Sequence, residues 1–239
     1  HPGRFFYIKD DDTGEIFSAP YEPVRASLDD FSFSVGGHDI KWKVEALNLC
    51  VELTLSLSVD APIELWSVVI TNMSKSKINR NISFYPYFTI GYMSWLNQSA
   101  TFNVELNGIV AKAITPYQKV EDYYKNRHFK DHTFLLSDCL PSSWSANQTV
   151  FEGAGGLTNP DEINRDKLSC QPSCYDVPVA VLQYQISMTN ESEKRINLCF
   201  GAAKDEHELL DIKEKYLGHE QDLSLETQKY EHYLSQASG

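Results

Sequence analysis

A run of acidic residues near the start of the chain is the densest group of possible metal ligands in the sequence. Asp10 to Asp12 and Glu15 surround Gly14. Carboxylate oxygens are preferred by Ca²⁺, but a calcium loop places its glycine later and adds a distal glutamate. Asp and Gly are also the residues that tight turns require. We therefore interpret the run as a solvated hairpin turn and predict no metal site in this chain.

Two other pairs have the residue types of metal ligands. His128 and His132 lie four residues apart, but no glutamate follows the first histidine as a zinc protease motif requires, so both are interpreted as loop histidines. Cys170 and Cys174 lack the two-residue gap of most zinc pairs, which leaves a local disulfide or two free thiols as alternatives. The five cysteines are an odd number in a chain that is large enough to fold without disulfides, which favours a reducing, cytoplasmic location.

Several enzyme classes lack support in the sequence. It contains no Gly-x-Ser-x-Gly elbow, phosphate loop or dinucleotide fingerprint. The net charge of -12 argues against nucleic acids and anionic membranes as partners. Aromatic side chains could instead present flat faces to sugar rings, although each is more commonly a core residue. These aromatic candidates are Tyr7, Trp42, Trp66, Tyr85, Tyr87, Tyr92, Trp95, Tyr123, Tyr124 and Trp144.

Alternation of apolar and polar residues predicts a chain that is mostly β. A hairpin is expected from strands 4–9 and 15–18, joined by the acidic turn. Further strands are predicted at residues 31–35, 40–44, 51–59, 65–71, 82–88 and 133–136, with 179–188 and 195–200 as a final pair. We expect these strands to follow one another as a long antiparallel meander. Residues 116–144 otherwise have the composition of a long loop.

The character of the sequence changes after residue 203. Residues 205–216 and 223–234 carry apolar side chains near helical spacing among many charges. We therefore divide the chain into a β domain, residues 1–203, and a helical segment, residues 204–239.

Several motifs resemble, in order, those of the family 94 glycoside phosphorylases, formerly glycosyltransferase family 36. The segment 7–18, Tyr-Ile-Lys-Asp-Asp-Asp-Thr-Gly-Glu-Ile-Phe-Ser, is similar to the opening hairpin of that family. Residues 60–66 and 70–74 resemble a strand with Pro-x-Glu that leads to a Thr-Asn-x-Ser turn. Later landmarks are similar at residues 151–153, 159–160, 178–183 and 200–202. The resemblance spans residues 7 to about 208.

This resemblance implies a galactose mutarotase-like super-sandwich followed by linker helices, with the catalytic (α/α)₆ barrel outside this chain. The full-length protein would be an inverting β-glucoside phosphorylase or glycosyltransferase that uses inorganic phosphate or glucose 1-phosphate and no other cofactor. Its partners would be a β-linked oligosaccharide or sugar phosphate, its own barrel and a second copy in a homodimer. This chain alone would hold no catalytic residue and would be inactive.

In the family, a loop of the sandwich approaches the acceptor side of an active site, and by position this loop lies near residues 151–160. Members that act on disaccharides often have an arginine after the glycine that Gly153 matches, whereas this chain has Ala154. The substrate-binding residues that we expect here are Arg127, His128, Trp144, Glu152, Gly153 and Gly155.

Two alternatives remain open. The chain could be a stand-alone carbohydrate-binding or interaction module, although its polar helical tail speaks against this. A mutarotase-like epimerase would need a histidine and a glutamate that converge in the sandwich cleft, for which His38 or His207 could be nominated on fold analogy alone.

Overall fold

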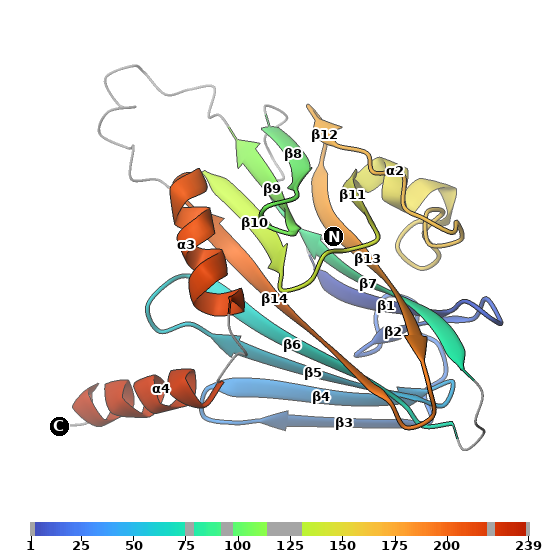
Figure 1. Ribbon diagram of the computed structural model, residues 1–239, viewed down its shortest axis with the longest axis horizontal. Coiled ribbons are helices and arrows are strands. Elements are labelled where there is room, and N and C mark those ends of the chain that lie inside the picture. Colours follow the sequence, from blue (N-terminus) through green and yellow to red (C-terminus); the bar gives the residue numbers. More distant parts are fainter. Residues whose placement is uncertain (1–2, 75–78, 92–97, 114–130, 219–222, 238–239) are drawn as a thin grey trace.

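Two antiparallel sheets form the molecule in this computed structural model, which describes residues 3–74, 79–91, 98–113, 131–218 and 223–237 (Figure 1). The five-stranded sheet has the order β11 (Ser143–Asn147), β13 (Pro178–Met188), β7 (Arg80–Thr89), β1 (Arg4–Asp10), β2 (Ile16–Ala19). The nine-stranded sheet has the order β12 (Ser173–Cys174), β8 (Gln98–Asn103), β9 (Gly108–Ala113), β10 (His132–Ser137), β14 (Glu193–Ala203), β6 (Ile63–Asn72), β5 (Leu49–Leu57), β4 (Asp39–Ala46), β3 (Asp30–Val35). The predicted β super-sandwich is confirmed.

The main core lies between the two sheets, because side chains alternate along a strand and one apolar face of each sheet turns toward the other sheet. Val51 and Leu53 of β5 are fully buried there, opposite Phe6 of β1 and Phe84 of β7. This is the alternation that the sequence shows most clearly. The edge strand β3 differs from its prediction, because all six of its residues are exposed rather than half-buried. The reason is that the nine-stranded sheet extends past β2, the last strand of the smaller sheet.

The predicted final strand pair is wrong, and the predicted meander is confirmed only from β3 to β6. β6 and β7 are consecutive in sequence but lie in different sheets, and so are β13 and β14. β13 pairs with β7 and β11, whereas β14 pairs with β6 and β10. Alternation identifies a strand and its buried face, but it does not identify the neighbour to which the strand bonds.

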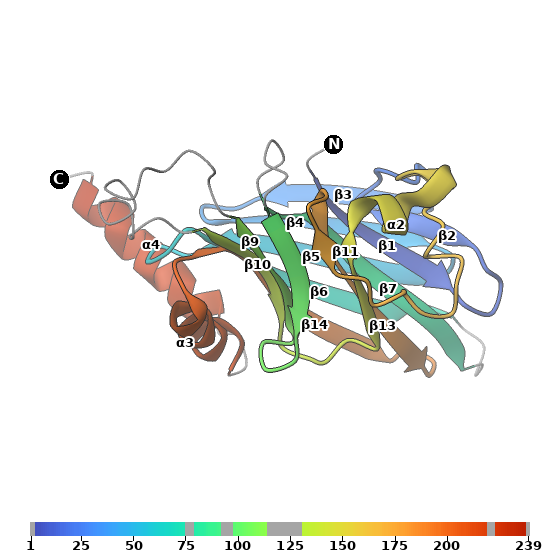
Figure 2. The same ribbon diagram turned by 90° about the horizontal axis from the view of Figure 1, so that it is seen from above.

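Two helices follow the last strand, as predicted. α3 (Glu206–Leu217) begins at Asp205, whose carboxylate accepts a hydrogen bond from the backbone N–H of Glu208 at 2.9 Å. Its apolar residues Leu209, Ile212 and Tyr216 cover the outer face of the nine-stranded sheet. α4 (Leu223–Ala237) extends beyond the ends of β3 and β4 (Figures 1 and 2). Within the described ranges, no helix combines the length and the apolar composition that a membrane span requires.

The acidic run forms the predicted turn between β1 and β2, but it is not simply solvated. Asp10 is only 4% exposed, and its carboxylate accepts from the backbone N–H groups of Asp12 and Thr13. The same carboxylate forms an ion pair with Arg80 of β7. These bonds give Asp10 a structural role in the turn. Within the described residues no cluster of three possible metal ligands occurs.

Arg80 also connects the two sheets. Its second terminal nitrogen donates to the backbone carbonyl of Leu47 at 2.6 Å, in the turn between β4 and β5. Leu47 and Asn48 both have positive φ in this turn, which matches the two-residue hairpin geometry that follows the twist of the strands. Arg80 therefore joins the hairpin of the small sheet to a hairpin of the large one.

Gly108 at the start of β9 is expected to tolerate no side chain. A Cβ there would lie 2.3 Å from the carbonyl oxygen of Leu135 and 2.8 Å from the Cα of Leu136. Because these are backbone atoms of the neighbouring strand, Gly108→Ala should lower the free energy of unfolding by about 1–3 kcal/mol. Urea unfolding measures this, with Gly37→Ala as the control, since nothing lies within 4 Å of a Cβ at Gly37. Equal stability of the two variants would contradict the prediction.

Candidate functional site

The segment that follows β11 packs on the outer face of the five-stranded sheet (Figures 1 and 2). We call residues 148–163 the α2 loop. It contains the helix α2 (Gln148–Glu152), the short 3₁₀ turn η1 (Gly153–Gly155) and the return to Ile163. Asn147 begins the helix, because its side-chain oxygen accepts from the backbone N–H of Val150 at 3.1 Å. The predicted residues Glu152, Gly153 and Gly155 all lie in this loop.

Phe151 anchors the α2 loop to the sheet. Its side chain is fully buried, with its ring centroid 5.4 Å from that of Tyr87 and 6.0 Å from that of Tyr7. The hydroxyl of Tyr7 donates to the carbonyl of Leu157 at 2.9 Å. The loop is therefore attached to the sheet near its start by apolar packing and in its middle by a hydrogen bond.

Glu152 lies between the loop and the sheet rather than at the tip. Its Oε1 accepts from the hydroxyl of Tyr87 at 3.1 Å and from the side-chain amide of Gln148 at 2.6 Å. Burial, and then the charge of Glu152, raise the pKa of Tyr7 and of Tyr87 well above the usual range. Both phenols thus remain hydrogen-bond donors beside the carboxylate.

Asp161 closes the tip of the α2 loop. Its two carboxylate oxygens accept from the backbone N–H groups of Ala154 at 3.0 Å and Gly155 at 3.1 Å. Gly153 has φ +55°, and a Cβ there would lie 2.1 Å from the Asp161 carboxylate. Gly153 and Ala154 are exposed. The loop therefore presents a fixed tip that carries no large side chain.

The other predicted binding residues do not join this loop in the structure. Trp144 lies in β11 rather than in a loop, and it packs toward the core between the sheets, with its ring centroid 5.7 Å from that of Phe102. The α2 loop covers the opposite face of the same sheet. Arg127 and His128 lie outside the described residues.

The remaining candidates have structural surroundings. His132 begins β10, and its Nδ1 is 2.6 Å from a carboxylate oxygen of Asp131. All five cysteines are free, so Cys170 and Cys174 form no disulfide here. His207 lies on the exposed surface of α3, and the ring of His38 faces Tyr230 of α4 at 6.3 Å.

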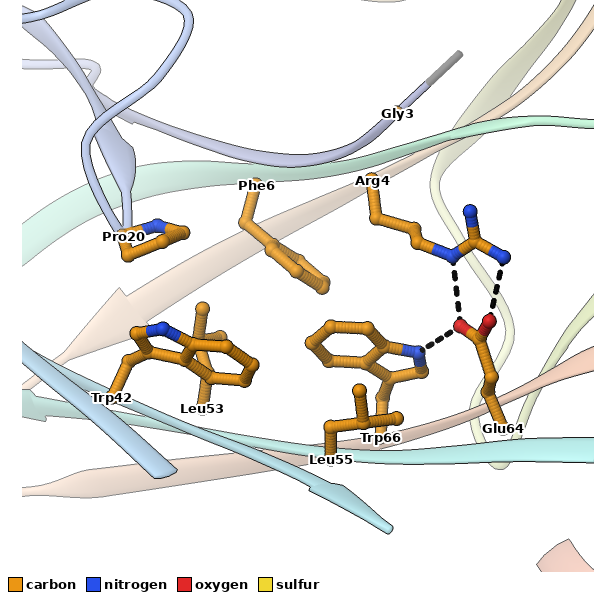
Figure 3. A pocket seen from close by; sticks show the side chains of 9 residues that line it. All are labelled: Gly3, Arg4, Phe6, Pro20, Trp42, Leu53, Leu55, Glu64 and Trp66. Carbon is orange, nitrogen blue, oxygen red and sulfur yellow. Dashed lines mark hydrogen bonds and ion pairs between the residues drawn. The ribbon is translucent and has the colours of Figure 1, made fainter. Parts of the chain in front are cut away.

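Trp42 and Trp66, two of the aromatic candidates from the sequence, line a cleft at the open end of the sandwich that sequence reasoning did not predict (Figure 3). We call it the Trp42 cleft. Its volume is about 420 Å³. Arg4 of β1 forms two hydrogen bonds with Glu64 of β6, at 2.8 and 2.6 Å, and Trp66 Nε1 donates to the same carboxylate at 3.0 Å. The cleft is lined by Gly3, Arg4, Phe6, Pro20, Trp42, Leu53, Leu55, Glu64 and Trp66. This set contains a glutamate but no histidine, so it lacks the pair that epimerase chemistry would need.

A pH dependence follows from the tyrosines under the α2 loop. Burial is the main cause that raises the pKa of Tyr85 to about 12. A phenol whose pKa is raised in the folded state stabilises the fold fully below its unfolded pKa of about 10, and this stabilisation is lost as the pH rises through the folded value. The melting temperature should therefore fall steeply between about pH 10 and pH 12.

The variant Tyr85→Phe should flatten this part of the profile. The free energy of unfolding that is lost between the two pH values should be smaller by about 2–3 kcal/mol, which corresponds to a shift of about two pKa units. Circular dichroism melts measure the slope between about pH 9, which is about one unit below the unfolded pKa, and about pH 12, the folded pKa. Tyr175→Phe is the control, because that side chain is 73% exposed. A slope that is unchanged in Tyr85→Phe would contradict the assignment.

The two packed sheets, with the α2 loop on the outer face of the smaller one, define a β super-sandwich domain. The chain belongs to the family described as "Glycosyl hydrolase 94, supersandwich domain", which it matches over residues 1–219. It is 48% identical over 220 residues to a cellobionic acid phosphorylase of Neurospora crassa, covering 92% of this chain and 28% of that protein. It is 25% identical over 216 residues to an N,N'-diacetylchitobiose phosphorylase of Vibrio proteolyticus, covering 87% of this chain and 26% of that protein.

Among solved structures, a bacterial glucoamylase complexed with acarbose shares the fold, with a TM-score of 0.57 and 13% identity. The match covers 95% of this chain and 30% of the glucoamylase chain. This chain thus spans under a third of the length of each of these proteins. The match to the phosphorylase family confirms the resemblance seen in the sequence motifs.

Proposed function

We propose that the full-length protein is an inverting phosphorylase that cleaves the β-glucosidic bond of a disaccharide of the cellobionic acid type. The observation that carries this proposal is the 48% identity to a cellobionic acid phosphorylase, nearly twice the identity to the chitobiose enzyme. Residues 204–239 would then lead into a helical catalytic barrel, with the sandwich as a non-catalytic domain in front of it.

The reaction would be a single displacement at the anomeric carbon. An oxygen of inorganic phosphate attacks that carbon from the face opposite the glycosidic oxygen, the C–O bond to the aldonic acid breaks, and one carboxylic acid protonates the departing oxygen. Inversion converts the β-glucoside into α-glucose 1-phosphate and releases the aldonic acid. The chemistry uses phosphate as co-substrate and requires neither a metal nor an organic cofactor.

The role that we assign to the α2 loop is to border the acceptor sugar. Its carboxylates are already engaged, since Asp161 holds two backbone N–H groups and Glu152 holds Tyr87 and Gln148. An acidic acceptor would therefore meet a small tip whose carboxylates are hydrogen-bonded within the loop rather than free. Arg127 and His128, which lie outside the described residues, remain predicted substrate-binding residues.

The assembly that we propose follows from this role. The loop borders an active site that this chain does not contain, so it must be brought to one by the protein's own barrel or by a second copy in a homodimer. We further propose that the enzyme works in the cytoplasm, where glucose 1-phosphate enters metabolism without loss.

Phosphate release from glucose 1-phosphate tests the proposal. The full-length protein should transfer glucose to gluconate and much more slowly to glucose or N-acetylglucosamine, while the 239-residue chain should show no activity. Preference for N-acetylglucosamine would overturn the substrate assignment. Absence of transfer to any of these acceptors, combined with sugar binding by the chain, would instead favour a stand-alone carbohydrate-binding module, which the tryptophans of the Trp42 cleft make the second candidate.

A further inference from the structure

Three aromatic rings form a row on the inner face of the nine-stranded sheet. The ring centroids of Trp66 and Trp42 are 5.9 Å apart with an interplanar angle of 14°, and those of Trp42 and Phe33 are 5.8 Å apart. The rings come from β6, from β4 on the far side of β5, and from the edge strand β3. The row therefore begins inside the Trp42 cleft and runs outward to the edge of the sheet.

Exposure increases along the row. Trp66 is 4% exposed, Trp42 is half-buried and Phe33 is 53% exposed. The five-stranded sheet ends at β2, so it covers the first ring but not the last. Large apolar side chains that remain exposed beside a cleft commonly mark a binding surface.

The inner end of the row is polar and electrically neutral. The guanidinium of Arg4 lies 4.3 Å from the ring centroid of Phe200 and uses Nε and one terminal nitrogen for Glu64, whose carboxylate also accepts from Trp66 (Figure 3). The structure shows no bond, among the described residues, for the other terminal nitrogen of Arg4. The Arg4–Glu64 pair thus offers both a donor and carboxylate lone pairs at one fixed place.

These features match the chemistry of a neutral sugar. A glucose ring in a β-linked chain has two apolar C–H faces, which stack on aromatic rings, and a rim of equatorial hydroxyls, which need donors and acceptors. An anionic ligand fits less well, because its carboxylate would compete with Glu64 for Arg4.

We propose that the Trp66–Trp42–Phe33 row and the Arg4–Glu64 pair form a binding site for a short, neutral, β-linked gluco-oligosaccharide. The choice of a sugar as ligand rests on the proposed function, whereas the row, its exposure and its neutral end are properties of the fold. One sugar ring would occupy the cleft over Trp42, and the next would lie over Phe33.

Calorimetric titration of the 239-residue chain with cellobiose, cellotetraose and cellobionic acid tests this site. Saturable binding is expected for cellotetraose and weaker binding for cellobiose. Cellobionic acid should bind no more tightly than cellobiose. Trp42→Ala should weaken cellotetraose binding at least about tenfold, a loss of about 1.4 kcal/mol. Trp42→Phe should retain most of the affinity for cellotetraose, since phenylalanine keeps a flat ring.

Two further variants keep the test decisive. Phe33→Ala changes an exposed side chain, so the chain should fold normally and lose affinity for both cellotetraose and cellobiose, because the second sugar ring would lie over Phe33. Trp144→Phe is the matched control, because Trp144 of β11 stacks on Phe102 of β8, near the end of the nine-stranded sheet opposite β3 and β4. Equal weakening by Trp42→Ala and Trp144→Phe, or no saturable binding of cellotetraose, would overturn the proposal.

Analytical ultracentrifugation of the same samples identifies the main competing occupant. Phe31 and Val35, 49% and 66% exposed, extend the apolar surface beside Phe33, and a second copy of the chain could cover it. Concentration-dependent dimers that Phe33→Ala abolishes, without sugar binding, would overturn the sugar site. Phosphorolysis by the full-length enzyme is measured in a separate assay. Failure of the sugar site would abolish binding by the chain, whereas failure of the proposed function would abolish phosphorolysis.

Discussion

Asp161→Ala in the full-length enzyme is expected to lower kcat/KM for phosphorolysis of cellobionic acid by about 100-fold, because a displacement of about 1 Å at a substrate-positioning group can have an effect of this size. The carboxylate of Asp161 holds the backbone N–H groups of Ala154 and Gly155, which form the tip of the α2 loop. Without it the tip loses its geometry, while Phe151 keeps the loop attached to the sheet.

Gly153→Ala should act in the same direction, since it places a side chain at φ +55° and 2.1 Å from the same carboxylate. Steady-state kinetics with cellobionic acid measure both variants, and circular dichroism checks their folding. Asp211→Ala is the control, because Asp211 lies on the exposed surface of α3. If both loop variants kept the kcat/KM of the wild type, the proposed role of the α2 loop at the acceptor site would be wrong.

Arg80→Ala is expected to lower the free energy of unfolding by about 3–5 kcal/mol, the cost of leaving one partner of a buried ion pair alone. Asp10 is 4% exposed and would lose its charged partner, and the carbonyl of Leu47 would lose its donor. The link between the two sheets at this end of the sandwich would be lost with both bonds.

Urea unfolding measures this loss. Arg195→Ala is the matched control, because Arg195 pairs with Glu193 at 3.6 Å where both side chains are more than half exposed. Exposed pairs contribute about 0–1 kcal/mol, so this control should be nearly neutral. Similar destabilisation by the two substitutions would show that Arg80 does not connect the sheets as described.

Local patterns in the sequence were sufficient to predict most elements but not their arrangement. The alternation in β5 and the charged periodicity of α3 identified a strand and a helix correctly. β8 and β9 were missed, because the sequences Gln-Ser-Ala-Thr-Phe-Asn and Gly-Ile-Val-Ala-Lys-Ala have small or polar residues where a clear strand has large apolar ones. The assignment of strands to two sheets depends on long-range pairing, which no local pattern contains.

The candidate site was predictable only in part, for the same reason. Family resemblance placed Glu152, Gly153 and Gly155 in one loop. It did not identify Asp161, whose only local signal is an Asn-Pro-Asp sequence shortly after the glycines, where Asn and Asp favour turns. The Arg4–Glu64 pair joins residues 60 positions apart from different sheets, so the sequence alone contains no sign of it.

The most direct test of the central claim is to incubate the full-length protein with cellobionic acid and inorganic phosphate and to follow the products by ³¹P and ¹H NMR. The account predicts equal amounts of α-glucose 1-phosphate and gluconate, and no product from the 239-residue chain alone. Formation of the β anomer, or cleavage of N,N'-diacetylchitobiose in preference to cellobionic acid, would contradict it.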